Sequence, residues 1–232
     1  MQKRYVSRFF AIAALAITPA SADIPGRLQS RDQKPNPPVS TFRGSSYAEW
    51  SVRWWLWDFS LRAPDNPTVT PSAPCTNNQS GNVWYLYGGP ATVNCTVAPG
   101  TAIFLPVANT ECSSLESPPF FGATPADRAA CAKSWIDHLT NLSATIDGVA
   151  VQNLSAFRVQ TGDFPFSVPD NNILAVPGPA SGFSSADGYY LMLNPLPPGA
   201  HIIHITATFH DPSDPSQVVF PLDTTITVTV AH

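Results

Sequence analysis

Charged side chains are scarce in this sequence of 232 residues. Asp, Glu, Lys and Arg make up 12% of it, about half of the roughly 25% usual in soluble globular domains. Cations are the rarer kind, with 12 Lys and Arg against 16 Asp and Glu, and Arg158 is the last of them. Proteins that bind nucleic acid need clustered Lys and Arg to neutralise phosphates. We therefore expect no nucleic-acid partner.

Several motifs of catalysis and cofactor binding are also missing. The sequence has no G-x-x-x-x-G-K-[ST] and no G-x-G-x-x-G, so nothing in it predicts nucleotide binding. It has no G-x-S-x-G motif for a nucleophilic serine. Its four cysteines lack the Cys-x-x-Cys spacing of many zinc sites. We expect no cofactor.

The histidines do not have the spacing of a metal site. His201 and His204 lie an odd number of positions apart on a predicted strand, so they face opposite sides. His204 and His210 share a face, but six residues of strand separate them by roughly 20 Å. His138, on a predicted helix, could join them only through tertiary packing. We therefore expect no metal ligands and two solvated histidines on the strand.

Residues 1–22 have the features of a signal peptide for Sec-type export. Three cations precede the apolar run 9–17, which is too short to span a bilayer, and an Ala-x-Ala cleavage motif ends at Ala22. Cleavage there would remove three cations and no acid, changing the net charge from −4 to −7. No later segment is long and apolar enough to span a membrane. We predict an extracellular or periplasmic protein.

The rest of the chain has the composition of a folded domain. Hydrophobic residues make up 44% of the sequence and aromatic residues 11%, which is enough for a core and excludes wholesale disorder. Residues 23–44 are polar, rich in proline and without periodicity, so we expect a flexible leader there. We predict that residues 45–232 form a single compact domain.

All four cysteines follow the predicted signal peptide. An even number of cysteines in an exported protein predicts disulfide bonds. Three pairings are possible, and we favour the sequential one, Cys75–Cys95 and Cys112–Cys131. Each bond would close a loop of about 20 residues, worth on the order of 3 kcal/mol in the chain-entropy account.

A tryptophan-rich segment from Ser46 to Arg62 predicts the first helix. Ser46 and Glu49 form a capping box. At about 100° per residue the apolar side chains fall on two opposite faces, which is typical of a helix buried between layers. Glu49 precedes Arg53, and Asp58 precedes Arg62, by four positions, a favourable spacing for ion pairs.

The other elements predict a mainly β fold. A second helix is expected from about Pro125 to Leu139, with Thr124 at its N-cap. Residues 91–97 and 101–108 flank a Pro-Gly turn and predict a hairpin. Short strands separated by turns are typical of an antiparallel β-sandwich. Further strands are predicted at 83–87, 144–151 (a hairpin with an Asp-Gly turn), 164–168, 173–176, 189–193, 201–209 and 225–230.

Two sequence motifs of this chain are similar to those of a known protein family. They are Tyr47-x-Glu49-Trp50-Ser51-x-Arg53-Trp54-Trp55-x-Trp57 and Phe104-Leu105-Pro106-Val107-x-Asn109-x-Glu111-Cys112. Both resemble a family of exported, mostly bacterial proteins with no assigned activity, so the resemblance implies no reaction. The stretch from Leu196 to Ile205 resembles the penultimate strand of bacterial immunoglobulin-like modules. That second resemblance implies an immunoglobulin-like sandwich for residues 143–232.

Two of the three glutamates are candidate catalytic residues. Glu49 on a buried helix must be paired or neutral, because an isolated buried carboxylate is very unfavourable. Glu111 ends a predicted strand in the polar cluster 109–111, beside Cys112, where a disulfide would hold a site rigidly. The structural alternatives are a buried ion pair of Glu49 with Arg53 and a turn whose side chains bond local amides.

Arg53, Trp54, Trp57 and Asn109 are candidate ligand-binding residues, because sugar rings and small organic molecules stack on aromatic faces. Core packing of the tryptophans is the alternative. Three functional hypotheses follow. The first is a protein that binds a carbohydrate or small organic ligand near the tryptophan-rich helix. The second is an extracellular hydrolase or lyase that uses Glu49 or Glu111. The third is an envelope structural or partner-binding protein.

Overall fold

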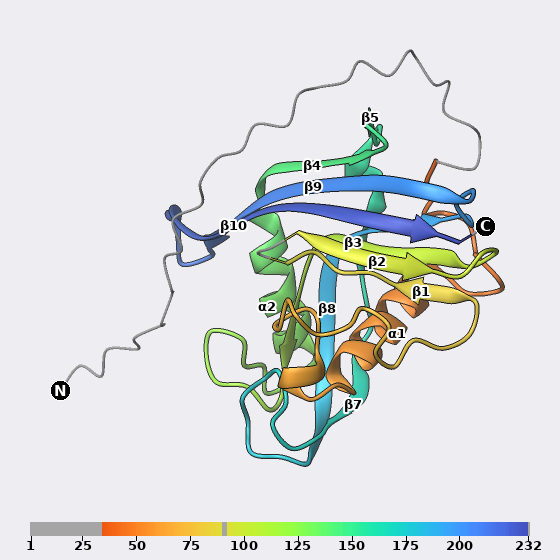
Figure 1. Ribbon diagram of the computed structural model, residues 1–232. Coiled ribbons are helices and arrows are strands. Elements are labelled where there is room, and N and C mark those ends of the chain that lie inside the picture. Colours follow the sequence, from red (N-terminus) through yellow and green to blue (C-terminus); the bar gives the residue numbers. More distant parts are fainter. Residues whose placement is uncertain (1–33, 90–91, 232) are drawn as a thin grey trace, which may run out of the picture.

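The computed structural model describes residues 34–89 and 92–231 as two β-sheets and two α-helices (Figure 1). The helices are α1 (Tyr47–Phe59) and α2 (Pro125–Asp137). The first sheet has the order β1-β3-β8-β6, and β7 also pairs with β8. The second has the order β2-β10-β9-β4-β5. The predicted signal peptide and residues 23–33 of the predicted leader lie outside the described residues.

Each sheet takes strands from both halves of the chain. The first contains β1 (Val83–Tyr85), β3 (Ala102–Ser113), β6 (Arg158–Gln160), β7 (Phe164–Val168) and β8 (Ala180–Leu193). The second contains β2 (Val93–Val97), β4 (Thr140–Ile146), β5 (Val149–Ala150), β9 (Gly199–Asp211) and β10 (Asp214–Val230). Short 3-10 turns follow α1, as η2 (Ala63–Asp65), and precede β6, as η3 (Leu154–Phe157). The mainly β, sandwich-like fold with two helices is thus confirmed.

The sheets are mixed rather than purely antiparallel. β1 runs parallel to β3, and β2 runs parallel to β10, whereas the other pairings are antiparallel. The predicted hairpin of residues 91–108 is therefore wrong, because β2 and β3 belong to different sheets. Their turn, at Gly100 with φ +75°, changes the chain direction without deciding which sheet the next strand joins.

The predicted strand 173–176 is also absent from the described chain. The Asn172 side chain donates to the carbonyl oxygens of Pro169 and Val176, at 2.9 and 3.0 Å, and so holds this segment as a turn. Such side-chain bonds to nearby backbone groups compete with strand pairing.

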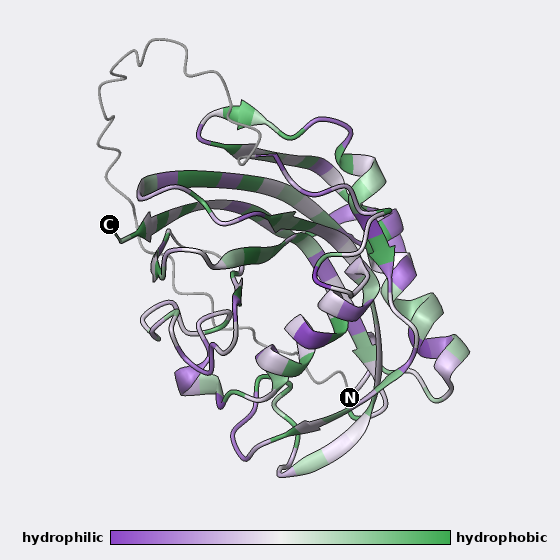
Figure 2. Ribbon diagram, turned by 90° about the vertical axis from the view of Figure 1, so that its right-hand side faces the viewer, coloured by the Kyte–Doolittle hydropathy of each residue, from purple (hydrophilic) through white to green (hydrophobic). Residues whose placement is uncertain are grey.

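Alternation of apolar and polar residues gives β2 and β9 of the second sheet one buried face each, and the hydropathy of this sheet changes in alternating bands in Figure 2. Ile203, Ile205 and Ala207 of β9 are buried in this core. His201 lies on the same buried face of β9 and is only 2% exposed. Its two ring nitrogens lie 2.8 Å from Asp147 Oδ2 and 2.8 Å from Pro197 O, so burial leaves neither without a partner.

α1 packs on the first sheet, and its aromatic side chains are buried on more than one side, as its sequence predicts. Tyr47 packs edge-on against Phe104 of β3, and Trp55 Nε1 donates to the Tyr190 hydroxyl of β8 at 3.2 Å. The capping box of Ser46 and Glu49 is formed. A second capping box, of Thr124 and Asp127, begins α2, which packs against β3 and β8.

Residues 34–44, the described end of the predicted flexible leader, are bound to this domain. The backbone N–H of Asn36 donates to Met192 O at 2.8 Å. The Tyr47 hydroxyl donates to Asn36 O at 2.5 Å and accepts from the Met192 N–H at 3.0 Å. The start of the described chain is thereby attached to β8 and α1.

Both predicted disulfides are confirmed. Cys75–Cys95 joins the loop after α1 to β2, and Cys112–Cys131 joins β3 to α2. Within the described ranges, no helix combines the length and apolar character needed to cross a bilayer.

Candidate functional site

A cavity of about 340 Å³ lies beside β3, between α1, α2 and the β9–β10 hairpin. Most of its lining is apolar, and much of it is aromatic. The lining residues with polar side chains, apart from the indole N–H groups, are Asp58, Thr68, Asn109 and Thr110. None of the lining residues is a Lys, Arg or His.

Six aromatic side chains of the lining form three pairs, one from each side of the cavity. Trp54 and Trp55 of α1 meet edge to face, with ring centroids 5.0 Å apart. Phe120 stacks on Trp135 of α2 at 4.9 Å. The third pair, Phe209 of β9 and Phe220 of β10, has centroids 6.2 Å apart. Aromatic rings thus line the cavity from three sides.

Trp54 and Trp55 are held in place by hydrogen bonds of their indole N–H groups. Trp54 Nε1 donates to Leu86 O at 2.7 Å, and Trp55 Nε1 donates to the Tyr190 hydroxyl. Burial raises the pKa of Tyr190 to about 12, so this hydroxyl is neutral at physiological pH. The α1 wall is therefore preorganised.

The edge of β3 forms the floor of the cavity. β1 pairs with β3 only at residues 102–104, and on the side away from β8 the next described backbone pairing of β3 is the bridge of Ser113 with Phe121. The register with β8 shifts between Pro106 and Ala108, and such a bulge re-aims the side chains that follow it. After this bulge, the consecutive residues Asn109 and Thr110 both line the cavity.

Asp58 is the acid of the cavity and is only 3% exposed. Its Oδ1 accepts hydrogen bonds from Asn66 Nδ2 at 2.9 Å and from Thr68 Oγ1 at 3.0 Å. Its Oδ2 receives none from the described residues. Burial raises the pKa of Asp58 to about 6, although these two hydrogen bonds oppose the rise. The predicted ion pair with Arg62 is absent, because Arg62 is exposed and makes no described ion pair.

Asn109 brings an amide to the same cavity. Its Nδ2 is buried and has no hydrogen-bond partner among the described residues. The Tyr190 hydroxyl is a polar neighbour, but the geometry of that contact does not make a hydrogen bond. Gly188 lies opposite Asn109 in β8, and a Cβ there would come within 2.6 Å of Asn109 Cβ. The glycine therefore allows β3 and β8 to place this amide.

Glu111 lies next to the cavity but not in its lining. It is 5% exposed, accepts from the Ser184 hydroxyl and hydrogen-bonds to Glu116, which itself accepts from Ser113 Oγ at 2.9 Å. Burial raises the pKa of Glu111 well above its usual value, and the nearby charge of Glu116 adds to that rise. Burial also raises the pKa of Glu116. Two of the three glutamates thus form a buried pair in which the pKa of each carboxyl is raised.

Besides Glu111, three of the predicted site residues lie outside the cavity lining. Glu49 is exposed, and hydrogen bonds from Ser46 lower its pKa. The expected ion pair of Glu49 with Arg53 is not formed among the described residues. Instead, the Arg53 guanidinium lies 4.4 Å from the Trp50 ring centre and donates to Ser45 Oγ at 2.9 Å. Trp57 Nε1 donates to Asn77 O at 3.0 Å. Of the predicted ligand-binding residues, the structure brings together only Trp54 and Asn109.

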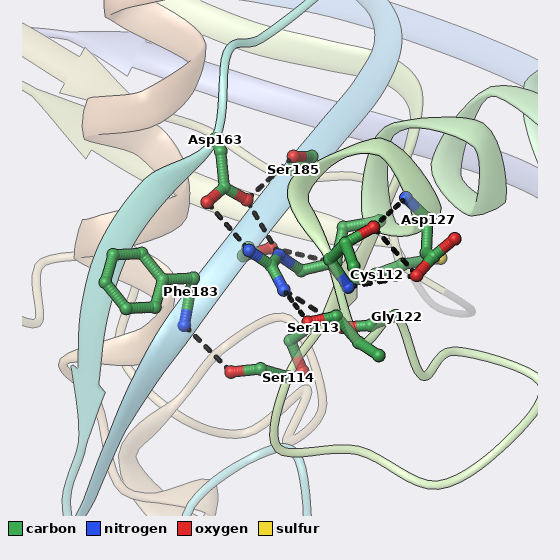
Figure 3. Close-up of polar contacts among 12 residues, drawn as sticks. Cys112, Ser113, Ser114, Gly122, Asp127, Asp163, Phe183 and Ser185 are labelled. Carbon is green, nitrogen blue, oxygen red and sulfur yellow. Dashed lines mark hydrogen bonds and ion pairs between the residues drawn. The ribbon is translucent and has the colours of Figure 1, made fainter.

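The α2 wall is fixed by a buried arginine and by the disulfide at Cys112. Arg128 is 3% exposed and makes two bonds to Asp163, Nε to Oδ1 at 2.7 Å and Nη2 to Oδ2 at 2.8 Å. Its Nη1 donates to Gly122 O at 3.0 Å. Figure 3 shows Asp163, Ser185 and Gly122 converging in this network, close to Cys112. These contacts hold α2 and the segment before it, and so position Phe120 and Trp135.

No group of three or more His, Cys, Asp and Glu side chains that could hold a metal ion occurs in the ranges 34–89 and 92–231.

Comparisons with known proteins add little to this geometry. No protein-family model and no curated protein matches the chain. Among solved structures, a cysteine protease inhibitor, EhICP2, from Entamoeba histolytica is 12% identical, with a TM-score of 0.23, over 64% of this chain and 95% of that one. Amebosin and PbICP-C in complex with falcipain-2 are each 14% identical, with TM-scores of 0.19 and 0.21, over 65% of this chain and 99% of theirs. Likenesses this weak carry no argument about function.

Several lining residues were not predicted from the sequence. Asp58 was assigned to an ion pair, although it follows Trp54 by four and Trp55 by three positions, a spacing that places all three on one side of a helix. Phe120, Trp135 and the pair from β9 and β10 reach the cavity through tertiary packing. No local pattern in the sequence signals their convergence.

Proposed function

We propose that this protein binds a small organic ligand with an apolar or aromatic body in the cavity beside β3. The observation that carries the proposal is the convergence of three aromatic pairs with two polar groups that have unused hydrogen-bonding capacity. These groups are the Oδ2 of Asp58 and the Nδ2 of Asn109. A mostly apolar cavity with a few placed polar groups is the usual form of a small-molecule site.

The size and chemistry of the cavity support a small apolar molecule better than a carbohydrate. Its volume of about 340 Å³ falls in the range of ligand pockets, roughly 300 to 1,000 Å³. Each sugar hydroxyl that is buried needs a hydrogen-bond partner. Only four polar side chains besides the indoles line this cavity, and the Thr68 hydroxyl already donates to Asp58 and Asn66.

The free edge of β3 does not favour an added peptide strand. Pro106 has no N–H to donate, and the bulge after it interrupts the regular spacing of backbone groups. Both features are ways in which natural edge strands avoid pairing with other chains. A compact ligand that contacts side chains fits this edge better than an extended peptide does.

The proposal includes an oxidising compartment, which the two disulfides support. The hydrolase or lyase hypothesis has less support, because Glu49 and Glu111 do not line a common cavity. A partner-binding role has some support from a shallow groove with two exposed apolar side chains, Leu56 and Phe183. That groove has no converging polar groups like those beside β3.

A screen of small apolar and aromatic molecules tests this proposal. Intrinsic tryptophan fluorescence and the thermal unfolding midpoint, Tm, are measured for the intact protein with each compound. A ligand at 100 times its Kd stabilises the folded state by about 2.7 kcal/mol, which raises Tm measurably. Binding that changes tryptophan emission and raises Tm is the expected result. A screen in which neither quantity changes for any compound would contradict the proposal.

A further inference from the structure

Asp58 is a buried carboxylate that has no cationic partner among residues 34–89 and 92–231. The polar pairs of the described residues involve other acids: Asp163, Asp137 and Asp187 pair with Arg or Lys, and Asp147 and Asp223 pair with histidines. Within the described part of the chain, the Asp58 side chain has only the neutral groups of Asn66 and Thr68 as hydrogen-bond partners. Both bonds end on Oδ1, which leaves Oδ2 for a ligand.

The surroundings of this carboxylate do not balance its charge. None of the residues that line the cavity is a Lys, Arg or His, and the charge of Asp58 adds to the rise in the pKa of another acid, Glu111. Taking a carboxylate out of water without a counter-ion is strongly unfavourable. A ligand that supplies one positive charge would remove this imbalance, whereas an anionic ligand would increase it.

The aromatic walls favour the same kind of ligand. The face of a tryptophan, tyrosine or phenylalanine ring attracts a cation, most strongly where water is excluded. Trp54 and Trp55 lie in α1 one turn before Asp58 and line the same cavity. Phe120 and Trp135 line it from the α2 side. An acid surrounded by indole and phenyl rings is the arrangement that recognises organic ammonium groups.

We propose, building on the proposed function, that the ligand is an organic ammonium cation with a small apolar or aromatic body. Its ammonium group bonds to Asp58 Oδ2 and lies against the rings of Trp54 and Trp55. Its body packs between Phe120, Trp135 and the aromatic pair of the β9–β10 hairpin. The Asn109 amide donates to an acceptor atom on the ligand where one is present.

A comparison of two matched probes tests the charge of the ligand. Phenethylammonium and 2-phenylethanol have the same carbon skeleton, and only the first is charged. Titration calorimetry on the intact protein at pH 7.5 measures both Kd values. The proposal predicts that phenethylammonium binds at least tenfold more tightly. Equal affinities, or tighter binding of the alcohol, would overturn it.

Two variants test whether the charge of Asp58 causes the tighter binding of phenethylammonium. Asp58→Asn keeps the shape of the side chain and removes its charge. It should weaken phenethylammonium binding at least tenfold and change 2-phenylethanol binding less than twofold. Asp65→Asn removes the same charge from an exposed position outside the cavity and should leave both affinities unchanged. Equal losses in the two variants would show only a long-range charge effect and would overturn the proposal.

The outcomes also separate this inference from the proposed function. If neither probe binds, and the wider screen finds no ligand, both are wrong. If the two probes bind equally, the cavity binds ligands but does not select a cation. The comparison of probes on the unaltered protein decides between cation and neutral ligand even if Asp58→Asn folds poorly.

Discussion

Asp58 of α1 and Asn109 of β3 line the same cavity, and each presents one polar atom without a hydrogen bond from the described residues. One of these atoms is an acceptor and the other is a donor. Between them, the lining is almost entirely aromatic and aliphatic. The two atoms can therefore orient a ligand whose binding energy comes mainly from contact with the rings.

Removing the Phe120 ring should weaken ligand binding without a general loss of structure. Phe120→Ala deletes one aromatic contact from the α2 wall, and a contact of this kind contributes about 1 to 1.5 kcal/mol, or about tenfold in Kd. Phe183→Ala is the matched control, because Phe183 is exposed and lines a different groove. Fluorescence titration with any ligand found in the screen measures the Kd of both variants. Equal losses of affinity would place the ligand elsewhere.

The buried carboxyl of Glu111 should make the protein less stable as pH rises. Because the fold raises the pKa of Glu111, the folded state holds its proton at pH values where the unfolded chain has released it. Stability is then fully present below the ordinary pKa, near 4.3, and falls as pH increases toward the raised pKa. Burial also raises the pKa of Asp58 and the pKa of Glu116, so these groups add to the same decline.

Glu111→Gln should flatten this decline in the free energy of unfolding, measured by urea denaturation between pH 5 and pH 8. Glu49→Gln is the control, because the pKa of Glu49 is lowered rather than raised. The stability that ionised Glu49 contributes is lost only as pH falls. Glu49→Gln should therefore not change the slope of the free energy of unfolding against pH above pH 5. An unchanged slope in Glu111→Gln would show that this carboxyl is ionised in the folded protein.

Gly188→Ala should distort β3 where it carries Asn109. The added Cβ would lie 2.6 Å from Asn109 Cβ and 2.7 Å from Ala108 O, and part of that contact is with rigid backbone. We expect a loss of about 1 to 3 kcal/mol in the free energy of unfolding. Gly162→Ala, with no neighbour within 4 Å of the new Cβ, should change stability by less than about 1 kcal/mol. Equal stabilities of the two variants would argue against the close approach of β3 and β8.

The two disulfides should contribute similarly to stability but differently to the cavity. They span 20 and 19 positions, so replacing either pair with serines should cost about 3 kcal/mol. Only Cys112–Cys131 ties α2, which carries Trp135, to β3. Ligand affinity should fall more in Cys112→Ser with Cys131→Ser than in Cys75→Ser with Cys95→Ser. Equal affinities, measured where both variants are folded, would contradict this assignment.

Local patterns predicted most of the elements of this fold. The capping box of Ser46 and Glu49, the N-cap at Thr124, both disulfides and the Asp147-Gly148 turn depend on residues close in sequence, and all are present. The parallel pairings of β1 with β3 and of β2 with β10 were not predicted. β2 and β10 are distant in sequence, and in neither case does a turn specify the sheet that a strand joins.

The candidate site was predicted less well, for a related reason. Trp54 and Asn109 were identified because they stand in unusual local motifs. Asp58 was paired with Arg62 by helix spacing, but Asn66 and Thr68 fold back onto α1 and take that place. A spacing of four residues allows an ion pair, whereas tertiary packing decides whether it forms.

The pKa of Asp58, measured by carboxyl-carbon NMR with and without ligand, tests the central claim most directly. In the free protein this pKa should be about 6, because the carboxylate is buried without a cation. Saturating phenethylammonium should lower it, since a bound cation favours the ionised form, and 2-phenylethanol should not lower it. A pKa of Asp58 that does not change when phenethylammonium binds would contradict the account.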